Sequence, residues 1–227
     1  TSEGPTNNHA VGNLLLTALW DRNQDLVNGL DRIGDLLKVV GRVLPMALEP
    51  LDIEGKFENN GQASVVRGQV QVAVATGKVK ELRLIPSNPK VTPEAIAAIA
   101  DADWITFGPG SWLSSVMPHF LFKEQADAFK NSPAKKIMIF NLPDKSTSDE
   151  FSGISLEEHL QLVLDHVPDL TFDIALIDKV FEGKEPGFTQ LVEKCGGRVI
   201  TLDLADNDVN FHHDKNKLIS AFTHIFS

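Results

Sequence analysis

Four short apolar runs alternate with helix-like segments from residue 93 to the end of the chain, and this alternation limits the possible folds most strongly. The runs are WITF at 104–107, KKIMIFNLP at 135–143, FDIALID at 172–178 and RVITLDL at 198–204. In the segments between them, apolar residues recur at intervals of three and four. Such alternation is typical of βαβ units, so we predict an α/β fold with a mostly parallel sheet and helices on both faces.

Local signals also predict helix boundaries. Pro93 favours the start of a helix over 93–101, and further helices are expected near 123–131 and 188–194. Ser155 and Glu158 match a capping box at the start of SLEEHLQLVLDHV.

The segment between residues 51 and 86 has the period of two that indicates β-strands. Two runs flank ENNGQ, in which Asn60-Gly61 is a strong signal for a tight hairpin turn. VKELRLIP at 79–86 alternates as a further strand. We expect an antiparallel β-hairpin extension of the sheet. Because no linker or internal repeat interrupts the pattern, we assign residues 1–227 to a single α/β domain.

Two amphipathic helix patterns precede the first strand, which is an unusual opening for an α/β protein. We therefore expect the chain to be a fragment whose first strands lie upstream. The two apolar faces consist of Val11, Leu14, Leu15, Ala18 and Leu19, and then of Leu26, Leu30, Ile33, Leu37 and Val40.

The charge balance bears on the kind of partner. The chain has 21 Lys and Arg against 31 Asp and Glu, a net charge of −10, and so lacks the basic excess typical of nucleic-acid binding. No window approaches 18 consecutive apolar residues, so we expect no membrane span. The single cysteine, Cys195, excludes an internal disulfide and fits a reducing compartment, so we expect a cytoplasmic protein.

The segment GPGS at 108–111 directly follows the run 104–107, at the edge where ligands bind in open parallel sheets. Gly110 would let a ligand approach the backbone, and Ser111 could cap a helix whose N–H groups face an anion. The G-x-G-x-x-G pattern fails at Leu113, and no G-K-[ST] is present. Spacing alone leaves a phosphate cradle and an ordinary strand-to-helix turn equally open.

Other polar residues are candidates for the same site. Arginine makes two-pronged contacts with phosphate, although an arginine near a helix end is often simply solvated. Asparagine offers both a donor and an acceptor, although it also caps helices. The candidates are Asn7, Asn8, His9, Gly12 and Asn13 in NNHAVGN, Arg42 in GRVLPM, Arg67 in the hairpin, and Asn141 after the run 135–140.

A metal site in the segment DLADNDVNFHHD is not expected. Asp206, Asp208 and Asn210 have the spacing of a calcium loop, but Phe211 and Lys217 replace the glycine and glutamate that such a loop requires.

Five blocks in a fixed order resemble a known family. They are HAVGNLLLTAL, GRVLPMALEP, VRGQ, ADWITFGPGSWLSSVMPHFL and FSGISLEEHL, and the similarity runs from about residue 9 to about residue 180. The chain resembles the gluconeogenesis factor family of bacteria (YvcK-like), which is related to the 2-phospho-lactate transferases (CofD-like) of deazaflavin cofactor synthesis.

The resemblance implies a Rossmann-like fold and a nucleotide-type ligand. For the factor this is a UDP-sugar such as UDP-N-acetylglucosamine, and for the transferases a nucleotide-activated phospholactate. Matched to the family's blocks, the implied ligand-binding residues are His9, Gly12, Asn13, Arg42, Gly108, Gly110, Ser111 and Asn141.

The chain also departs from the family pattern. After Asn141 the family continues with Thr-Gln-x-Gly-Glu-Thr, whereas this chain has LPDKSTSDEF. The family's initial strand, its Gly-rich turn and an acidic stretch associated with magnesium in the transferases are absent. We therefore expect no metal ligands from that stretch, and magnesium only in a full-length protein.

These observations lead us to expect a cytoplasmic regulatory protein that binds a nucleotide sugar and supports growth and cell shape on gluconeogenic carbon sources. Two alternatives stay open: a magnesium-dependent transferase of the phospholactate type, and a protein–protein scaffold without a ligand. The expected partner is a phosphate-bearing small molecule and not nucleic acid. Assembly into a homo-oligomer stays open.

Overall fold

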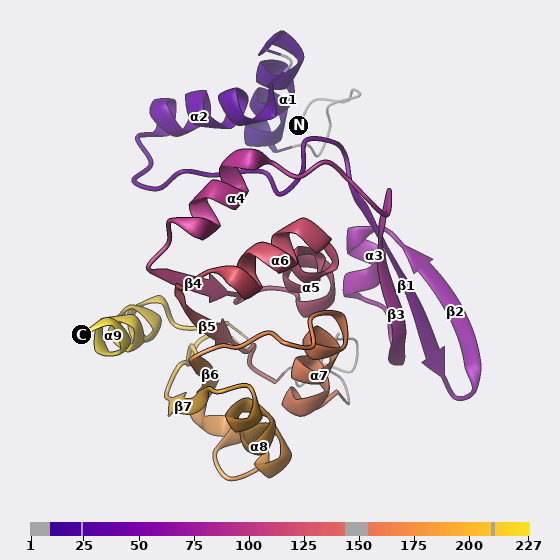
Figure 1. The fold of residues 1–227 in the computed structure, drawn as a ribbon, viewed down its shortest axis with the longest axis vertical. Helices are drawn as coiled ribbons and strands as arrows, with labels where there is room; N and C mark the ends of the chain where they lie inside the picture. Colours follow the sequence, from indigo (N-terminus) through magenta and orange to yellow (C-terminus); the bar gives the residue numbers. More distant parts are fainter. Residues whose placement is uncertain (1–9, 24, 144–153, 210–211) are drawn as a thin grey trace.

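The computed structural model describes residues 10–23, 25–143, 154–209 and 212–227, and it contains two sheets (Figure 1). A parallel sheet has the order β4-β5-β6-β7, and an antiparallel sheet has the order β2-β1-β3. The predicted α/β class with an antiparallel extension is therefore confirmed. The strands are β1 (Asp52–Asn59), β2 (Gln62–Arg67), β3 (Lys78–Ile85), β4 (Trp104–Phe107), β5 (Lys135–Ile139), β6 (Ile174–Asp178) and β7 (Arg198–Leu202).

The helices agree closely with the sequence pattern after residue 93. The predicted capping box is present, with Ser155 and Glu158 exchanging two hydrogen bonds of 3.1 Å. Within the described residues, no helix combines the length and the hydrophobicity that a membrane span requires. The helices are α1 (Val11–Asn23), α2 (Leu26–Leu37), α3 (Gln69–Ala73), α4 (Pro93–Ala100), α5 (Met117–Leu121), α6 (Lys123–Asn131), α7 (Leu156–His166), α8 (Pro186–Lys194) and α9 (Lys215–Phe226), with a π-helical turn η1 (Trp112–Val116) and a 3₁₀ turn η2 (Lys179–Phe181).

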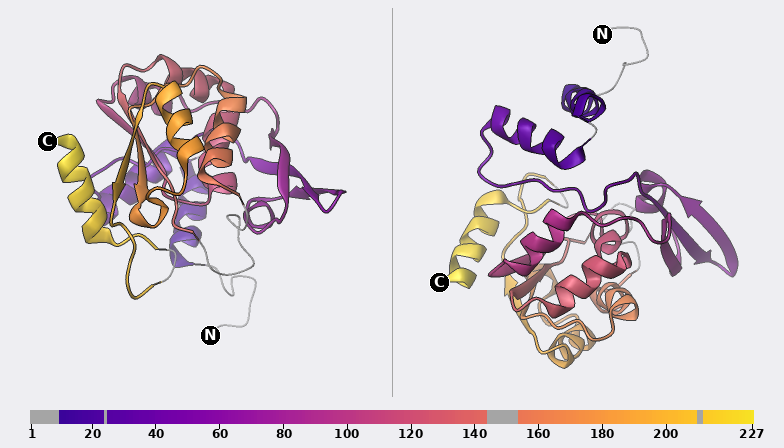
Figure 2. Two further views of the ribbon diagram at one scale, coloured as in Figure 1. Left: turned by 90° about the horizontal axis from the view of Figure 1, so that it is seen from below. Right: turned by 45° about the horizontal axis from the view of Figure 1, so that its top comes forward.

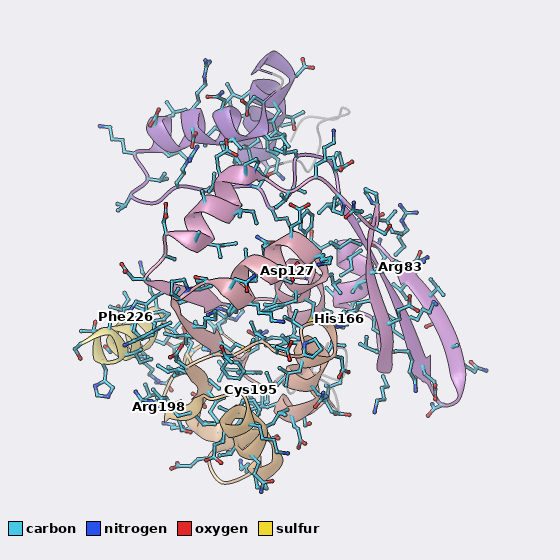
Figure 3. All side chains as sticks on the ribbon, viewed as in Figure 1. Arg83, Asp127, His166, Cys195, Arg198 and Phe226 are labelled. Carbon is cyan, nitrogen blue, oxygen red and sulfur yellow. The ribbon has the colours of Figure 1, made fainter. Side chains whose placement is uncertain are left out.

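The parallel sheet is covered on both faces because its strands are apolar on both sides. In β5, Ile137 and Ile139 pack toward α9, whereas Met138 belongs to the larger core formed with α5, α6, α7 and α8. Figure 2 (left) shows α9 on one side of the strands and α7 and α8 on the other. On the α9 side, Phe226, labelled in Figure 3, lies 4.8 Å from the Trp104 ring, centroid to centroid.

The predicted hairpin is formed by β1 and β2. Asn60 and Gly61 both have positive φ angles, 51° and 78°, as a tight two-residue hairpin turn requires. β3 pairs with the other edge of β1, and the exposed face of this sheet carries ion pairs such as Arg83–Glu54. Arg83 is labelled in Figure 3.

The helix after the GPGS segment begins as a π-turn, which the sequence did not predict. Pro118 has no N–H to donate to the Ser114 carbonyl four residues earlier. Gln69 Nε2, from the short helix α3, donates to that carbonyl at 3.3 Å instead. The antiparallel region is thereby linked to the start of this helix.

The first two helices form a pair that stands away from the parallel sheet, with α4 between them and β4 (Figure 1 and Figure 2, right). Trp20 lies over Gly29 of α2, and its Nε1 donates to the Leu26 carbonyl at 3.3 Å. α2 ends when Lys38 adopts the left-handed conformation, φ 52°. The predicted continuation of the helix to Val40 is therefore wrong, and Val40 is fully exposed.

Candidate functional site

The GPGS turn joins the carboxyl end of β4 to the helical segment 112–121, beside the carboxyl end of β5. Gly108 has φ +79°, and a Cβ atom there would lie 2.7 Å from the Ile139 carbonyl oxygen. Only glycine meets both conditions without displacing β5. The close approach of the two strand ends therefore depends on Gly108.

Asn141 holds the next part of the turn. The Gly110 N–H donates to Asn141 Oδ1 at 3.2 Å, and Asn141 Nδ2 donates to the Gly110 carbonyl at 2.6 Å. The side-chain amide of Asn141, just after β5, thus pairs with both backbone groups of Gly110, just after β4. The structure brings Gly108, Gly110, Ser111 and Asn141 together, and Asn141 is turned toward the protein backbone.

Ser111 caps the helical segment as predicted, because its Oγ accepts a hydrogen bond of 3.3 Å from the Ser114 N–H. Trp112 is completely buried, stacks on Phe140 with ring centroids 4.9 Å apart, and donates from Nε1 to the His159 carbonyl at 3.1 Å. The end of the turn is therefore anchored in the core.

A pocket with a volume of about 380 Å³ opens beside this turn. It runs along the side of β4 that has no neighbouring strand in the described part of the chain. Gly108 and Pro109 line it from the turn, and Leu44 lines it from the loop after α2. The RVLP and GPGS blocks thus meet at one pocket.

Two polar side chains of this pocket were missed in the sequence. His119, on α5, places Nδ1 3.0 Å from Oε1 of Gln125 on α6, and both residues line the pocket. Burial lowers the pKa of His119, so its ring is neutral at pH 7. The available signal was His119 within the block VMPHFL, but the proximity of Gln125 depends on how α5 meets α6.

A second pocket, about 430 Å³, lies between the start of β3 and α7, and Leu113 contributes to its wall. Lys78 and Glu158 form an ion pair of 3.7 Å within its lining. Burial lowers the pKa of His159, also in this wall, to about 4, which keeps the imidazole uncharged at neutral pH.

The remaining predicted residues lie on other elements. His9, with Asn7 and Asn8, falls outside the described residues. Gly12 and Asn13 are exposed on α1. Arg42 donates from Nε and Nη2 to both carboxylate oxygens of Asp31, at 2.8 and 2.7 Å. This hydrogen bonding lowers the pKa of Asp31. Arg67 pairs with Asp52 at 2.7 Å.

The described ranges contain no set of ligands for the magnesium ion that the resemblance implies for a full-length protein. Within them, no group of three or more His, Cys, Asp and Glu side chains is placed to hold a metal ion. In the loop after β7, Asp206 Oδ1 instead accepts the backbone N–H groups of Asp208 and Val209, at 2.8 and 3.1 Å.

Known proteins resemble this chain in sequence and in architecture. The family described as 2-phospho-L-lactate transferase CofD matches residues 1–225. A crystal structure of a UPF0052 family protein from Bacillus halodurans superimposes with a TM-score of 0.79 at 26% identity, over 98% of this chain and 74% of that one.

Two curated relatives extend the comparison. The gluconeogenesis factor of Listeria monocytogenes is 31% identical over 96% of this chain and 70% of its own length. A Mycobacterium tuberculosis relative, provisionally named as a gluconeogenesis factor, is 38% identical over 75% of this chain. The matched region spans only 50% of that relative's length. Because the family match covers nearly every residue of the sequence, the chain belongs to the CofD family.

Proposed function

We propose that this chain is a nucleotide-sugar-binding regulator of the gluconeogenesis-factor type. The observation that carries the proposal is the GPGS turn, which Gly108 and Asn141 fix at the carboxyl edge of β4 and which borders a pocket. Ligands of open parallel sheets bind at that edge, outside the ends of the strands.

The phosphate groups of the ligand would lie against the turn and the beginning of the segment 112–121. The N–H group of Gly110 already donates to Asn141 Oδ1 and that of Ser114 to Ser111 Oγ, so the Trp112 N–H would supply a backbone donor. Arg42 would neutralise a diphosphate by exchanging the Asp31 carboxylate for a phosphate, which a guanidinium binds with the same two-pronged geometry.

The names of the relatives, and not the pocket, support the proposed regulatory role. A relative named gluconeogenesis factor is 31% identical over 96% of this chain. We propose that this chain links nucleotide-sugar supply to growth and cell shape on gluconeogenic carbon sources, in the cytoplasm. Binding without turnover suffices for such a role.

Isothermal titration of the chain with UDP-N-acetylglucosamine tests the proposal. We expect saturable heat, and we expect Arg42→Gln to weaken binding about tenfold, or about 1.4 kcal/mol. Arg67→Gln is the matched control, because it removes another exposed arginine that is paired with an aspartate. The absence of heat at millimolar ligand would remove this function.

A transferase is the second candidate, because the matching family carries that description over residues 1–225. The alcohol oxygen would attack the phospholactyl phosphorus of a nucleotide-activated phospholactate, the phosphoanhydride bond would break, and a nucleoside monophosphate would leave while the alcohol proton passes to solvent. Such a transfer would depend chiefly on positioning and charge stabilisation. Transfer to a deazaflavin alcohol, followed by chromatography with and without magnesium, would favour this candidate. Binding without product would favour the regulator.

A further inference from the structure

We propose that the free edge of β2 is a site at which two copies of this chain associate, through an antiparallel pairing of β2 with the β2 strand of the second copy, about a two-fold axis at Val65. The antiparallel sheet then continues from one copy into the other, in the order β3-β1-β2-β2-β1-β3. The inference is independent of the proposed ligand site, which does not involve this strand.

The backbone groups of β2 alternate between those that bind β1 and those that face away from it. In a two-residue hairpin the residues that flank the turn, here Asn59 and Gln62, bond to each other, and every second residue of β2 again faces β1. Gly68 agrees with this alternation, because its N–H donates to the Ile53 carbonyl at 2.8 Å. The residues whose N–H and carbonyl groups point to the free edge are therefore Ala63, Val65 and Arg67.

This edge is accessible and has none of the usual protection. Within the described residues β2 pairs only with β1, and it is the outermost strand of the sheet, on the side away from α9 (Figure 1). Edge strands are commonly protected by proline, lysine or a bulge. β2 contains neither residue, and the register shift of this sheet, between Lys56 and Phe57, lies on the ladder of β1 with β3. Val65, in the middle of the free edge, is 62% exposed.

The symmetry of the outward residues about Val65 makes the edge complementary to itself. In a pairing centred on Val65, each Val65 lies opposite the partner's Val65, and each Ala63 lies opposite the partner's Arg67. Every outward N–H and carbonyl group of one strand then meets its complement on the other. An axis at Ser64 would instead place Arg67 opposite the partner's Gly61, in the turn. The pairing centred on Val65 is therefore the register that uses the whole edge.

The charges on the exposed face agree with this register. Ala63 lies opposite Glu58 of its own β1. In the dimer Arg67 thus lies two strand spacings, roughly 9–10 Å, from the partner's Glu58, and no like charges are directly opposed. Arg67 and Glu58 now form exposed ion pairs with Asp52 and Lys80, and such pairs are exchanged at little cost. This charge complementarity identifies the occupant of the edge as a second copy of the chain.

Sedimentation velocity of the chain over a range of concentrations tests the site. The strands are short, so we expect a weak, reversible dimer. Val65→Pro should raise its dissociation constant about tenfold or more, because proline removes an N–H that faces the partner and keeps those that bind β1. Val65→Lys should also weaken it, because it sets two lysines opposite each other. Leu15→Lys is the matched control, since it changes an exposed apolar residue of α1.

A charge exchange tests the register. Arg67→Glu brings a carboxylate toward the partner's Glu58, and Glu58→Arg brings a guanidinium toward the partner's Arg67, so each single variant should weaken the dimer. The double variant Arg67→Glu/Glu58→Arg restores opposite charges at both positions and should dimerise more tightly than either single variant.

Thermal melting of each variant shows that the fold is intact. A chain that stays monomeric at its highest soluble concentration would overturn the proposal, and so would a dimer that Val65→Pro and Val65→Lys leave unchanged. A dimer that only Leu15→Lys dissociates would place the contact on α1 and overturn it as well. A double charge variant weaker than both single variants would overturn the pairing centred on Val65.

Discussion

The helix pair α1–α2 and the parallel sheet with its helices both come from strongly patterned sequence, yet they differ in how much of that pattern is buried. Leu160 of α7 is fully buried, as are Ile137 and Met138 of β5. On α1, by contrast, Val11 and Leu15 are 72% and 49% exposed. The same helical periodicity produces a core in one region and an open apolar surface in the other.

The difference shows what periodicity can and cannot specify. It establishes that one face of a helix is apolar, whereas burial depends on a partner from another part of the chain. The parallel sheet and its neighbouring helices supply such packing partners for α5 to α9. Within the described residues, the main packing partner of α1 is α2. Substitutions of glycine and asparagine should likewise change the free energy of unfolding more in the sheet region than in the helix pair. Matched substitutions in the two regions test this difference.

The largest contrast is expected between two leucines. Leu160→Ala should lower the free energy of unfolding by about 2–5 kcal/mol, because it leaves a cavity in a packed core. Leu15→Ala should change it by less than about 1 kcal/mol, because that side chain is half exposed. Urea unfolding measures both, and equal losses would remove the contrast.

The next largest effect on stability is expected at two glycines, Gly108 and Gly12. Gly108→Ala should cost roughly 3 kcal/mol, since it combines a positive φ with a Cβ atom 2.7 Å from the Ile139 oxygen. Gly12→Ala should stabilise by about 0.5–1 kcal/mol, because a Cβ atom there meets open space within a helix. Thermal melts of the two variants should therefore shift in opposite directions, and a shared direction would contradict the account of the turn.

Asparagines should follow the same division. Asn141→Ala removes both hydrogen bonds to Gly110 and should cost about 2 kcal/mol. Asn13→Ala, on the exposed face of α1, should stay within about 0.5 kcal/mol of the parent. Chemical denaturation tests the pair, and a neutral Asn141→Ala would show that the turn holds without its amide.

A smaller effect is expected on the pH dependence of stability, and it arises from His159 on α7, in the region of the parallel sheet. The pKa of His159 is about 4 in the fold and about 6.5 when exposed, so between these values the unfolded chain binds more protons. Its contribution to stability is complete above pH 6.5 and declines as the pH falls, by about 1 kcal/mol between pH 7 and pH 5.5. Plots of the free energy of unfolding against pH for the parent and for His159→Gln should therefore differ in slope between pH 5.5 and pH 7. Parallel slopes would rule out His159 as the group involved.

The sequence predicted local structure well where its causes are local. The Asn60-Gly61 turn, the Ser155–Glu158 capping box and the position of β4 depend on neighbouring residues, and all three are confirmed. The π-turn after GPGS was missed because it depends on Pro118 and on a distant donor, Gln69.

The site was predicted less completely for the same reason. Gly108, Gly110 and Ser111 were identified from one segment, and their common turn is present. The contact of Asn141 with Gly110 requires two strands to end side by side, and the pairing of His119 with Gln125 requires two helices to meet. The periodicity of a single sequence indicates neither which strands end side by side nor which helices meet.

An NMR titration with UDP-N-acetylglucosamine, following backbone amides, tests the central claim that the turn is the ligand site. We expect saturable shifts at Gly108, Gly110 and Ser111, and unchanged positions for Gly12 and the rest of α1. Asn141→Ala should weaken these shifts at equal ligand concentration. Shifts confined to α1 and α2, or none at millimolar ligand, would contradict the account.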